Sequence, residues 1–270
     1  MRAALRKVST MATGTPNPIG LSPRLASIVQ QLRLYKPSSP PTDDEDAVEE
    51  MDARGKIFSQ LGLAESSAPC HLEKLPPRRA AVLICLFEDD VGDLRVILTK
   101  RSSNLSSHSG EVSLPGGKTE EADVDDADTA TREAKEEIGL DPSLITVVTV
   151  LEPYISKHLL RVAPVISILT DKQAFKPVLN TDEVEVIFDA PLEMFLKDEN
   201  HRSEEREWLG VKYLIHFFDY ETKDNKFVIW GLTAFILIRA ASVVYQRSPS
   251  FPEQNPRFML PSPTSGTCSI

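Results

Sequence analysis

The segment of residues 80–87, AAVLICLF, constrains the fold more than any other part of the sequence. Its apolar residues run without interruption instead of alternating with polar ones, which is the pattern of a strand buried on both faces of a sheet. A turn signal at residues 90–93, DVGD, separates it from a second predicted strand at residues 94–99. Because a strand of this kind needs cover on both sides, the sequence predicts a layered α/β fold.

The elements predicted after these two strands alternate irregularly between helix and strand. Residues 129–138 have helical composition, with Gly139 as a stop signal and Pro142 just beyond it. The other predicted elements are strands at residues 145–151 and 162–169, a short helix at 191–196, a hairpin of strands at 213–219 and 227–230, and an apolar helix at 231–245. This order predicts a mixed sheet between helices and not a regular doubly wound sheet.

The two ends of the chain differ in composition from its middle. No Asp or Glu precedes Asp43, whereas six Lys or Arg do. This composition is typical of a transit peptide and predicts a mitochondrial location; the alternatives are an ordinary disordered tail and a cytoplasmic location. The predicted organisation is a transit peptide or disordered tail at residues 1–20, a helix (22–36) and linker at 21–46, the main domain at 75–245, and a disordered tail rich in Pro and Ser at 246–270.

Charge and composition exclude several classes of function. The net charge of −10 argues against a nucleic-acid partner, which needs a basic surface. Cys70, Cys85 and Cys268 are too far apart in sequence for a zinc motif or a disulfide framework, which favours a reducing compartment. The most apolar stretch, residues 228–238, is too short to span a membrane. The sequence leaves the oligomeric state open.

The helix at residues 129–138 carries an unusual group of carboxylates. At about 100° per residue, Glu133 and Glu137 lie one turn apart along the edge of its apolar stripe, and Glu136 lies further round on the same side. Like charges at this spacing destabilise a helix by roughly 0.2–0.5 kcal/mol, and partial burial increases the cost. A hard divalent cation, Mg²⁺ or Mn²⁺, would compensate for them.

A salt-bridged helix on the protein surface is the alternative interpretation of the same segment. Asp128, Arg132 and Glu136 alternate in sign at intervals of four residues. Such a ladder would account for Glu136, but it leaves Glu133 and Glu137 unexplained. The helix alone therefore does not decide between a metal site and a solvated face.

A glycine pair upstream favours the metal site. Gly116 and Gly117 lie between the basic strand end Lys100-Arg101 and the acidic helix. Paired glycines let the backbone approach a ligand closely, although by themselves they usually mark only a turn. Cations on one side and metal ligands on the other are what cleavage of a diphosphate requires.

These segments together resemble the Nudix family. Gly117, Asp123 and residues 132–140, REAKEEIGL, are similar to the Nudix box, G-x5-E-x7-R-E-U-x-E-E-x-G-U, in which U is aliphatic. Asp123 stands where the box has Glu, and one additional residue separates it from Arg132. This longer spacing is usual in the coenzyme A diphosphatases of the family, and the chain looks particularly like their plant members.

The upstream segment resembles the signature of the same subfamily, L-L-T-x-R-[SA]-x3-R-x3-G-x3-F-P-G-G. The matching residues are 97–102 (ILTKRS), Gly110 and 114–117 (LPGG), and the spacing agrees throughout. Ser106 replaces the second arginine, which removes one cation from the expected substrate loop. The resemblance covers roughly residues 75–245.

The resemblance implies a Nudix α/β/α sandwich with a mixed sheet and a set of site residues. Glu133, Glu136 and Glu137 would ligate Mg²⁺ or Mn²⁺, and Arg132 would orient these carboxylates. The expected substrate-binding residues are Lys100, Arg101, Ser102, Gly116 and Gly117. Glu183 is the candidate general base, with a solvated loop acid as the equal alternative.

The same resemblance implies hydrolysis of coenzyme A or an acyl-CoA to 3′,5′-ADP and 4′-phosphopantetheine or its acyl form. Another nucleoside diphosphate derivative, such as ADP-ribose or NADH, is the nearest alternative substrate. The remaining alternatives are a catalytically inactive module that binds nucleotide and a structural α/β domain with a salt-bridged helix.

Overall fold

The computed structural model describes residues 21–37, 57–59, 62–64, 78–156, 160–208 and 211–253. The predictions for residues 1–20, for 38–46 of the linker and for 254–270 of the tail lie outside these residues. Among the described helices, none combines the length and the apolar character needed to cross a membrane.

The main sheet has the mixed topology that the order of elements predicts. Its strands lie in the order β10-β4-β3-β9-β7, and the short strands β5, β6 and β8 pair with β4, β3 and β9 respectively. β3 and β9 run parallel, and every other pair in this sheet is antiparallel. The strands are β3 (Arg79–Glu88), β4 (Leu94–Arg101), β5 (Val112–Ser113), β6 (Gly116–Lys118), β7 (Ile145–Val150), β8 (Tyr154–Ile155), β9 (Arg161–Leu169) and β10 (Val184–Pro191).

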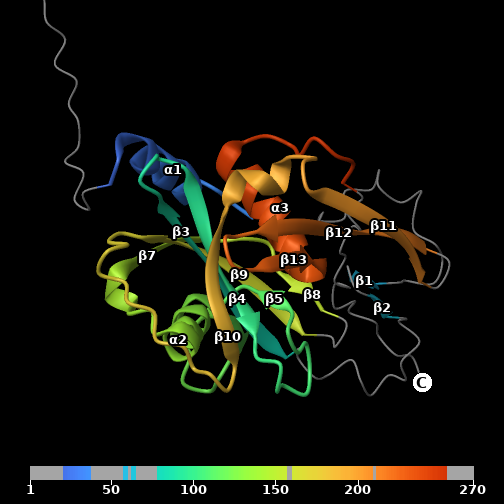
Figure 1. Cartoon of the computed structure of the whole chain (residues 1–270), viewed down its shortest axis with the longest axis horizontal. Coiled ribbons are helices and arrows are strands. Elements are labelled where there is room, and N and C mark those ends of the chain that lie inside the picture. The colour runs from blue at the N-terminus through green and yellow to red at the C-terminus, as the bar shows by residue number, and fades with distance from the viewer. Residues whose placement is uncertain are drawn as a thin grey trace, which may run out of the picture.

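Helices cover both faces of this sheet (Figure 1). α2 (Asp126–Ile138) packs on one face, where Ala130, Ala134 and Ile138 join a buried cluster with Leu83 and Ile97. α1 (Pro23–Arg33) and α3 (Gly231–Tyr245) pack on the other face. The protein is therefore an α/β/α sandwich, as predicted. β3, which contains the apolar segment 80–87, lies in the middle of the sheet.

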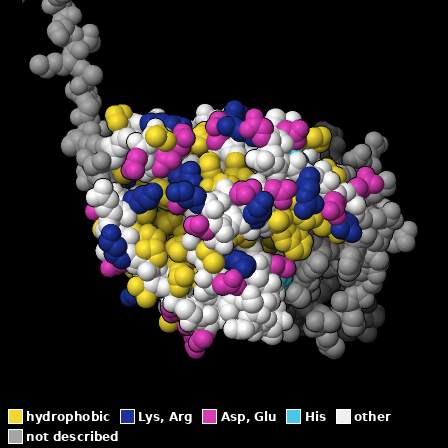
Figure 2. Space-filling view, in the orientation of Figure 1, with side chains coloured by type: hydrophobic (Ala, Val, Ile, Leu, Met, Phe, Trp, Pro, Cys, Tyr) yellow, Lys and Arg dark blue, Asp and Glu magenta, His cyan; other side chains and the backbone are white. Residues whose placement is uncertain are grey.

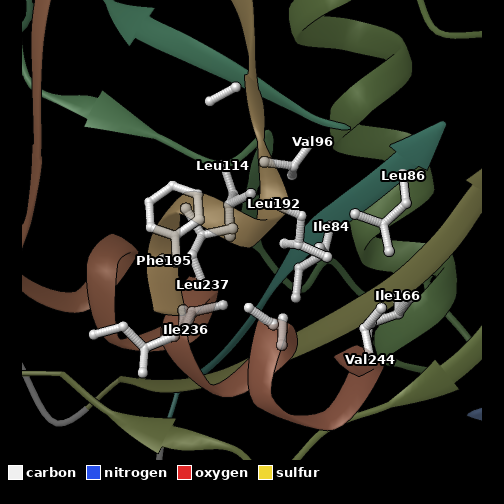
Figure 3. Close-up of a cluster of buried hydrophobic side chains, with 14 of the residues drawn as sticks. Ile84, Leu86, Val96, Leu114, Ile166, Leu192, Phe195, Ile236, Leu237 and Val244 are labelled. Atoms are coloured by element: carbon white, nitrogen blue, oxygen red, sulfur yellow. The ribbon is translucent and has the colours of Figure 1, made fainter. Parts of the chain in front are cut away.

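The larger core lies on the α1 and α3 side of the sheet. Figure 3 shows Ile84, Leu86 and Val96 from the sheet packed against Ile236 and Leu237 of α3. α1 adds Leu25, Val29 and Leu32, which are all buried in the same cluster. A polar contact reinforces this packing, because the Tyr35 hydroxyl donates to Glu152 Oε1 at 2.6 Å and Arg239 Nη2 donates to the same oxygen at 2.9 Å. α1 is therefore part of the domain, although it precedes the predicted boundary at residue 75.

Two smaller sheets accompany the main one: a three-stranded sheet with β12 between β11 and β13, and a two-stranded sheet of β1 and β2. The predicted hairpin at residues 213–219 and 227–230 is confirmed, but β10 and β11 were not predicted. The remaining elements are β1 (Ile57–Ser59), β2 (Gly62–Ala64), β11 (His201–Trp208), β12 (Val211–Glu221), β13 (Lys226–Trp230), and two short 3-10 helices, η2 (Pro142–Leu144) and η3 (Leu192–Leu196).

The predicted disordered tail is wrong for residues 246–253, which pack on the domain. Phe251 is buried, and its ring stacks on His201 with 3.7 Å between the ring centroids. The Ser250 amide donates to Leu196 O at 2.9 Å. The prediction failed because one aromatic residue within a segment rich in Pro and Ser has no periodic pattern.

We expect the protein to lose stability in acid because of two histidines that pack against Phe251, His201 and His216. His216 is fully buried and shares a 2.9 Å hydrogen bond with His201, and burial together with the nearby His201 lowers the pKa of His216 to about 4. In the unfolded chain this histidine binds a proton near pH 6.5. The stability that neutral His216 contributes is therefore complete above that pH and is lost as pH falls towards 4. We expect up to about 3 kcal/mol of unfolding free energy to disappear across this window.

Urea unfolding of wild type and His216→Phe at pH 7 and pH 4.5 measures this effect. The variant should lose less stability than wild type between the two pH values, whereas His108→Gln, at an exposed position, should behave like wild type. An equal loss in wild type and His216→Phe would contradict the assignment.

Candidate active site

Two glycines bring β6 close to both the central strand and α2. The β6 backbone pairs with β3, and a Cβ atom on Gly116 would lie 2.3 Å from Ala81 O. A Cβ atom on Gly117 would lie 2.5 Å from Glu133 Oε1. Gly116 also has a φ of +153°, which side chains rarely tolerate. The glycine pair therefore lets the backbone meet the acidic helix at its carboxylates.

Glu137 is a buried carboxylate at this junction. Its residue is 2% exposed, the Gly116 amide donates to its Oε2 at 3.2 Å, and Arg101 Nη1 lies 3.8 Å from its Oε1. Burial raises the pKa of Glu137 to about 7, and the Gly116 and Arg101 contacts only partly oppose this. The described side chains thus leave the charge of Glu137 incompletely compensated.

Arg132 holds the two other glutamates through one nitrogen. Its Nη1 donates to Glu133 at 3.1 Å and to Glu136 at 3.0 Å. The opposite edge of the guanidinium donates to both oxygens of Asp123 at 3.0 Å. Hydrogen bonds from Arg132 and from the Glu120 amide hold the pKa of Asp123 well below its usual range. Asp123, at the position of the Glu in the box, anchors the arginine that orients the carboxylates.

The predicted salt ladder is only half present. Arg132 pairs with Glu136, as expected, but the Asp128 carboxylate accepts from the Val124 amide at 3.2 Å. The ladder therefore does not explain the acidic face, because Arg132 is shared with Glu133 and Asp123.

The glutamates do not all converge as the helical spacing predicts. Burial is the main cause that raises the pKa of both Glu133 and Glu137; the Glu133 charge further raises the pKa of Glu137, and the Glu183 charge further raises both. Glu136 instead turns towards Arg132, and its side chain is 57% exposed. Across the residues that the structure describes, no three His, Cys, Asp or Glu side chains form a ready cage for a metal.

The chemistry of the donors nevertheless fits a hard divalent cation. Carboxylate oxygens are the preferred ligands of Mg²⁺ and Mn²⁺, and the incompletely compensated Glu137 is what such an ion would neutralise. Glu136 is exposed, so its side chain is free to turn from Arg132 without disturbing the core. Glu133, Glu136 and Glu137 remain the residues that would hold the ion.

Arg101 and Lys100 point to opposite faces of β4. Arg101 lies on the α2 face, beside Glu137, and its Nε is buried without a hydrogen-bond partner among the described residues. Lys100 Nζ instead donates to Glu185 Oε1 at 2.7 Å. Side chains alternate along a strand, so only Arg101 of the two predicted phosphate contacts reaches the carboxylates.

Glu183, the candidate general base, lies near enough to Glu133 and Glu137 for its charge to act on both. It precedes β10, and its charge contributes to raising the pKa of both Glu133 and Glu137. Its carbonyl accepts from the Ser102 amide at 2.8 Å, which places buried Ser102 at the same end of the sheet. The arrangement combines a carboxylate group, a partly unsatisfied guanidinium and a further acid, and this combination is suited to attack by water on a phosphate ester or anhydride.

His108 lies in the loop between Ser102 and Glu111, away from these contacts. Its Nδ1 shares a 2.9 Å hydrogen bond with Glu111 Oε2, a contact within the loop. Glu185 could not be singled out from sequence alone, because its partners Lys100 and Ser103 come from β4 and the loop after it, which are distant in the chain.

Comparisons with known proteins agree with this geometry. A family model described as "NUDIX domain" matches residues 77–230. The chain is 68% identical over 214 residues to "Nudix hydrolase 15, mitochondrial" of Arabidopsis thaliana, an alignment that covers 78% of this chain and 75% of that one. It is 62% identical over 237 residues to "Nudix hydrolase 22, chloroplastic" of the same plant, covering 87% and 78%.

A more distant relative carries a more specific name. The chain is 32% identical over 191 residues to "Peroxisomal coenzyme A diphosphatase NUDT7" of Mus musculus, covering 70% of this chain and 80% of that one. Nudix hydrolases cleave the diphosphate bond of nucleoside diphosphate derivatives and generally require a divalent metal ion. On the match of the family model and these relatives, the chain belongs to the Nudix hydrolase family.

Proposed function

We propose that the substrate is coenzyme A or an acyl-CoA, which is cut to 3′,5′-ADP and 4′-phosphopantetheine or its acyl form. The observation that carries the proposal is the buried Nε of Arg101, which has no hydrogen-bond partner in the part of the chain that the structure describes. Arg101 lies beside Glu137, in the segment similar to the coenzyme A signature. An anionic group on the substrate would supply the missing acceptor. The name of the mouse relative supports the same substrate class.

Each residue of the site has a defined task in this reaction. Glu133, Glu136 and Glu137 would hold a divalent metal ion, which would neutralise phosphate oxygens and lower the pKa of water. Arg132, anchored by Asp123, keeps Glu133 in place. Water attacks one phosphorus, the bond from that phosphorus to the bridging oxygen breaks, and the bridging oxygen leaves with the other phosphate.

In this proposal Glu183 handles the proton of the attacking water, and Arg101 handles the charge of the substrate. Glu183 is the proposed general base and takes the proton of the attacking water, since its carboxylate lies near Glu133 and Glu137. Arg101 binds a substrate phosphate, and Gly116, Gly117 and Ser102 shape the adjacent backbone. Lys100 has no such task in this arrangement, because Glu185 neutralises it.

Product identification tests the proposal. Purified protein is incubated with CoA and Mg²⁺ or Mn²⁺, and the products are identified by mass spectrometry, with a chelator in the control. We expect equal amounts of 3′,5′-ADP and 4′-phosphopantetheine, and no products with the chelator. Intact CoA under conditions in which ADP-ribose is hydrolysed would reject the proposed substrate.

Arg101→Ala should harm CoA hydrolysis more than hydrolysis of 3′-dephospho-CoA. CoA carries an additional 3′-phosphate, and the loop after Arg101 lacks the second arginine of the signature at Ser106. Loss of one charge-assisted contact costs about 1.5–3 kcal/mol, which is roughly ten- to a hundredfold in kcat/KM. Lys197→Ala, which removes a cation paired with Glu193, is the control and should affect neither substrate.

The measurement is kcat/KM for both substrates on all three proteins. Equal losses on the two substrates in Arg101→Ala would mean that Arg101 binds the diphosphate and that the 3′-phosphate is recognised elsewhere.

Import into mitochondria is the proposed fate of this protein. The motivating feature is the lack of acidic residues before Asp43, and the names of two plant relatives include an organelle. Residues 1–20 fused to a fluorescent reporter should direct it to mitochondria, whereas a fusion with Arg2, Arg6 and Lys7 changed to Gln should remain in the cytosol. A wild-type fusion that stays diffuse would contradict import, and one found in plastids would contradict the mitochondrial destination.

A further inference from the structure

Glu185 occupies an irregular position between the two segments that flank the site. The pairing of β10 with β4 shifts register between Val184 and Val186, so Glu185 is a bulged residue. A bulge redirects a side chain relative to its neighbours in the strand. Glu183, two residues earlier, acts electrostatically on the metal-binding glutamates, whereas the Glu185 carboxylate contacts Lys100 on the other face of β4.

Both carboxylate oxygens of Glu185 hold the start of the loop at residues 102–111. Oε1 accepts from Lys100 Nζ at 2.7 Å, and Oε2 accepts from Ser103 Oγ at 2.8 Å. Lys100 lies in the strand that leads into the loop, and Ser103 is inside it. The hydrogen bonds from Lys100 and Ser103 hold the pKa of Glu185 below its usual range, so its carboxylate is ionised at neutral pH.

Contacts inside the loop pass this anchoring on to its far end. The Ser103 carbonyl accepts from Ser109 Oγ at 2.7 Å, and the Arg101 amide donates to Glu111 O at 2.9 Å. Ser103 is therefore bonded both to Glu185 outside the loop and to Ser109 across it. The loop begins directly after Arg101, the last residue of β4, so the anchored segment adjoins the residue that makes the proposed phosphate contact.

We infer that Glu185 is a positioning residue that clamps the loop 102–111 to the strand following Glu183, so that substrate meets a preformed loop beside the catalytic carboxylates. The inference rests on the proposed function only in treating this loop as the substrate-binding one. Glu185 touches neither the glutamates nor Arg101 through its side chain, so its loss should weaken binding and spare the chemical step. Preformed binding loops contribute to affinity because their ordering cost is met on folding.

Kinetics of Glu185→Ala, Ser103→Ala and the double variant test the clamp. Glu185→Ala should raise KM about three- to tenfold and change kcat less than about twofold, since partly exposed charged hydrogen bonds have modest strength. Ser103→Ala should raise KM less, and the double variant should be no worse than Glu185→Ala, because both remove one connection. Glu193→Ala is the matched control: this surface glutamate also holds two cations, Lys197 and Arg247, and its loss should leave KM unchanged.

Hydrogen–deuterium exchange without substrate gives an independent readout. Amides of residues 103–110 should exchange faster in Glu185→Ala, while those of α2 stay as in wild type. An unchanged KM, a fall in kcat as large as the rise in KM, or unchanged exchange in the loop would each overturn the clamp. If CoA is not hydrolysed, the proposed substrate falls alone, because the exchange experiment needs no substrate and KM can be measured with ADP-ribose.

Discussion

Glu137→Gln should lower kcat by more than about a hundredfold and leave the fold intact. The substitution removes the charge of the buried carboxylate that Gly116 and Arg101 contact and keeps its volume. Loss of even an indirect partner of a metal ligand typically costs 10–100-fold, so loss of a ligand charge should cost more. The thermal midpoint measured with a chelator should not fall, because an ionised carboxylate whose pKa is raised by burial opposes folding at neutral pH.

The measurement combines kcat, the thermal midpoint and Mn²⁺ binding by calorimetry. Glu193→Gln, which changes an exposed glutamate paired with Lys197, serves as the control and should match wild type in all three. A Glu137→Gln protein that folds and keeps near wild-type turnover would show that the assignment of the metal site is wrong.

Gly117→Ala should lower activity and leave the stability of the fold unchanged. Gly116→Ala should first of all destabilise the fold. The Cβ atom of Gly117→Ala would overlap the Glu133 carboxylate, which is the free end of a flexible side chain and can move aside. The Cβ atom of Gly116→Ala would overlap the Ala81 carbonyl in β3, which cannot move, and φ is +153° there. We expect kcat to fall at least tenfold in Gly117→Ala and stability to fall by more than about 2 kcal/mol in Gly116→Ala.

Both variants are compared by kcat and by urea unfolding. Wild-type activity in Gly117→Ala would mean that the observed place of the Glu133 carboxylate is not needed for catalysis. A Gly116→Ala protein as stable as wild type would contradict the close approach of β6 to β3.

The core elements could be predicted from the sequence because the spacing of apolar residues within each element shows which face is buried. The apolar run in β3 and the stripe of Ala130, Ala134 and Ile138 in α2 give burial directly. β10 and β11 lack such a signal: β10 includes Glu185 and Asp189, and β11 is largely charged. Their strand structure depends on partners distant in sequence, β4 and β12, which no local pattern specifies.

The same distinction applies to the site. Helical spacing predicted that Glu133 and Glu137 border the core, and Glu137 proves to be buried. Spacing did not predict that Glu136 turns to Arg132, because that depends on the position of the guanidinium. Lys100 and Arg101 were both predicted to bind substrate, although neighbouring side chains of a strand lie on opposite faces of the sheet. The partner that neutralises Lys100, Glu185, required the register of β10 to be known.

A competition assay tests the central claim, metal-dependent cleavage of the CoA diphosphate, most directly. Equimolar CoA, ADP-ribose and NADH are offered together to the wild-type enzyme with Mg²⁺, and the initial rates of product formation give the ratios of kcat/KM. The account predicts that CoA is consumed at least about tenfold faster than either competitor, since one charge-assisted contact to the 3′-phosphate contributes that much. Faster consumption of ADP-ribose or NADH than of CoA would contradict it.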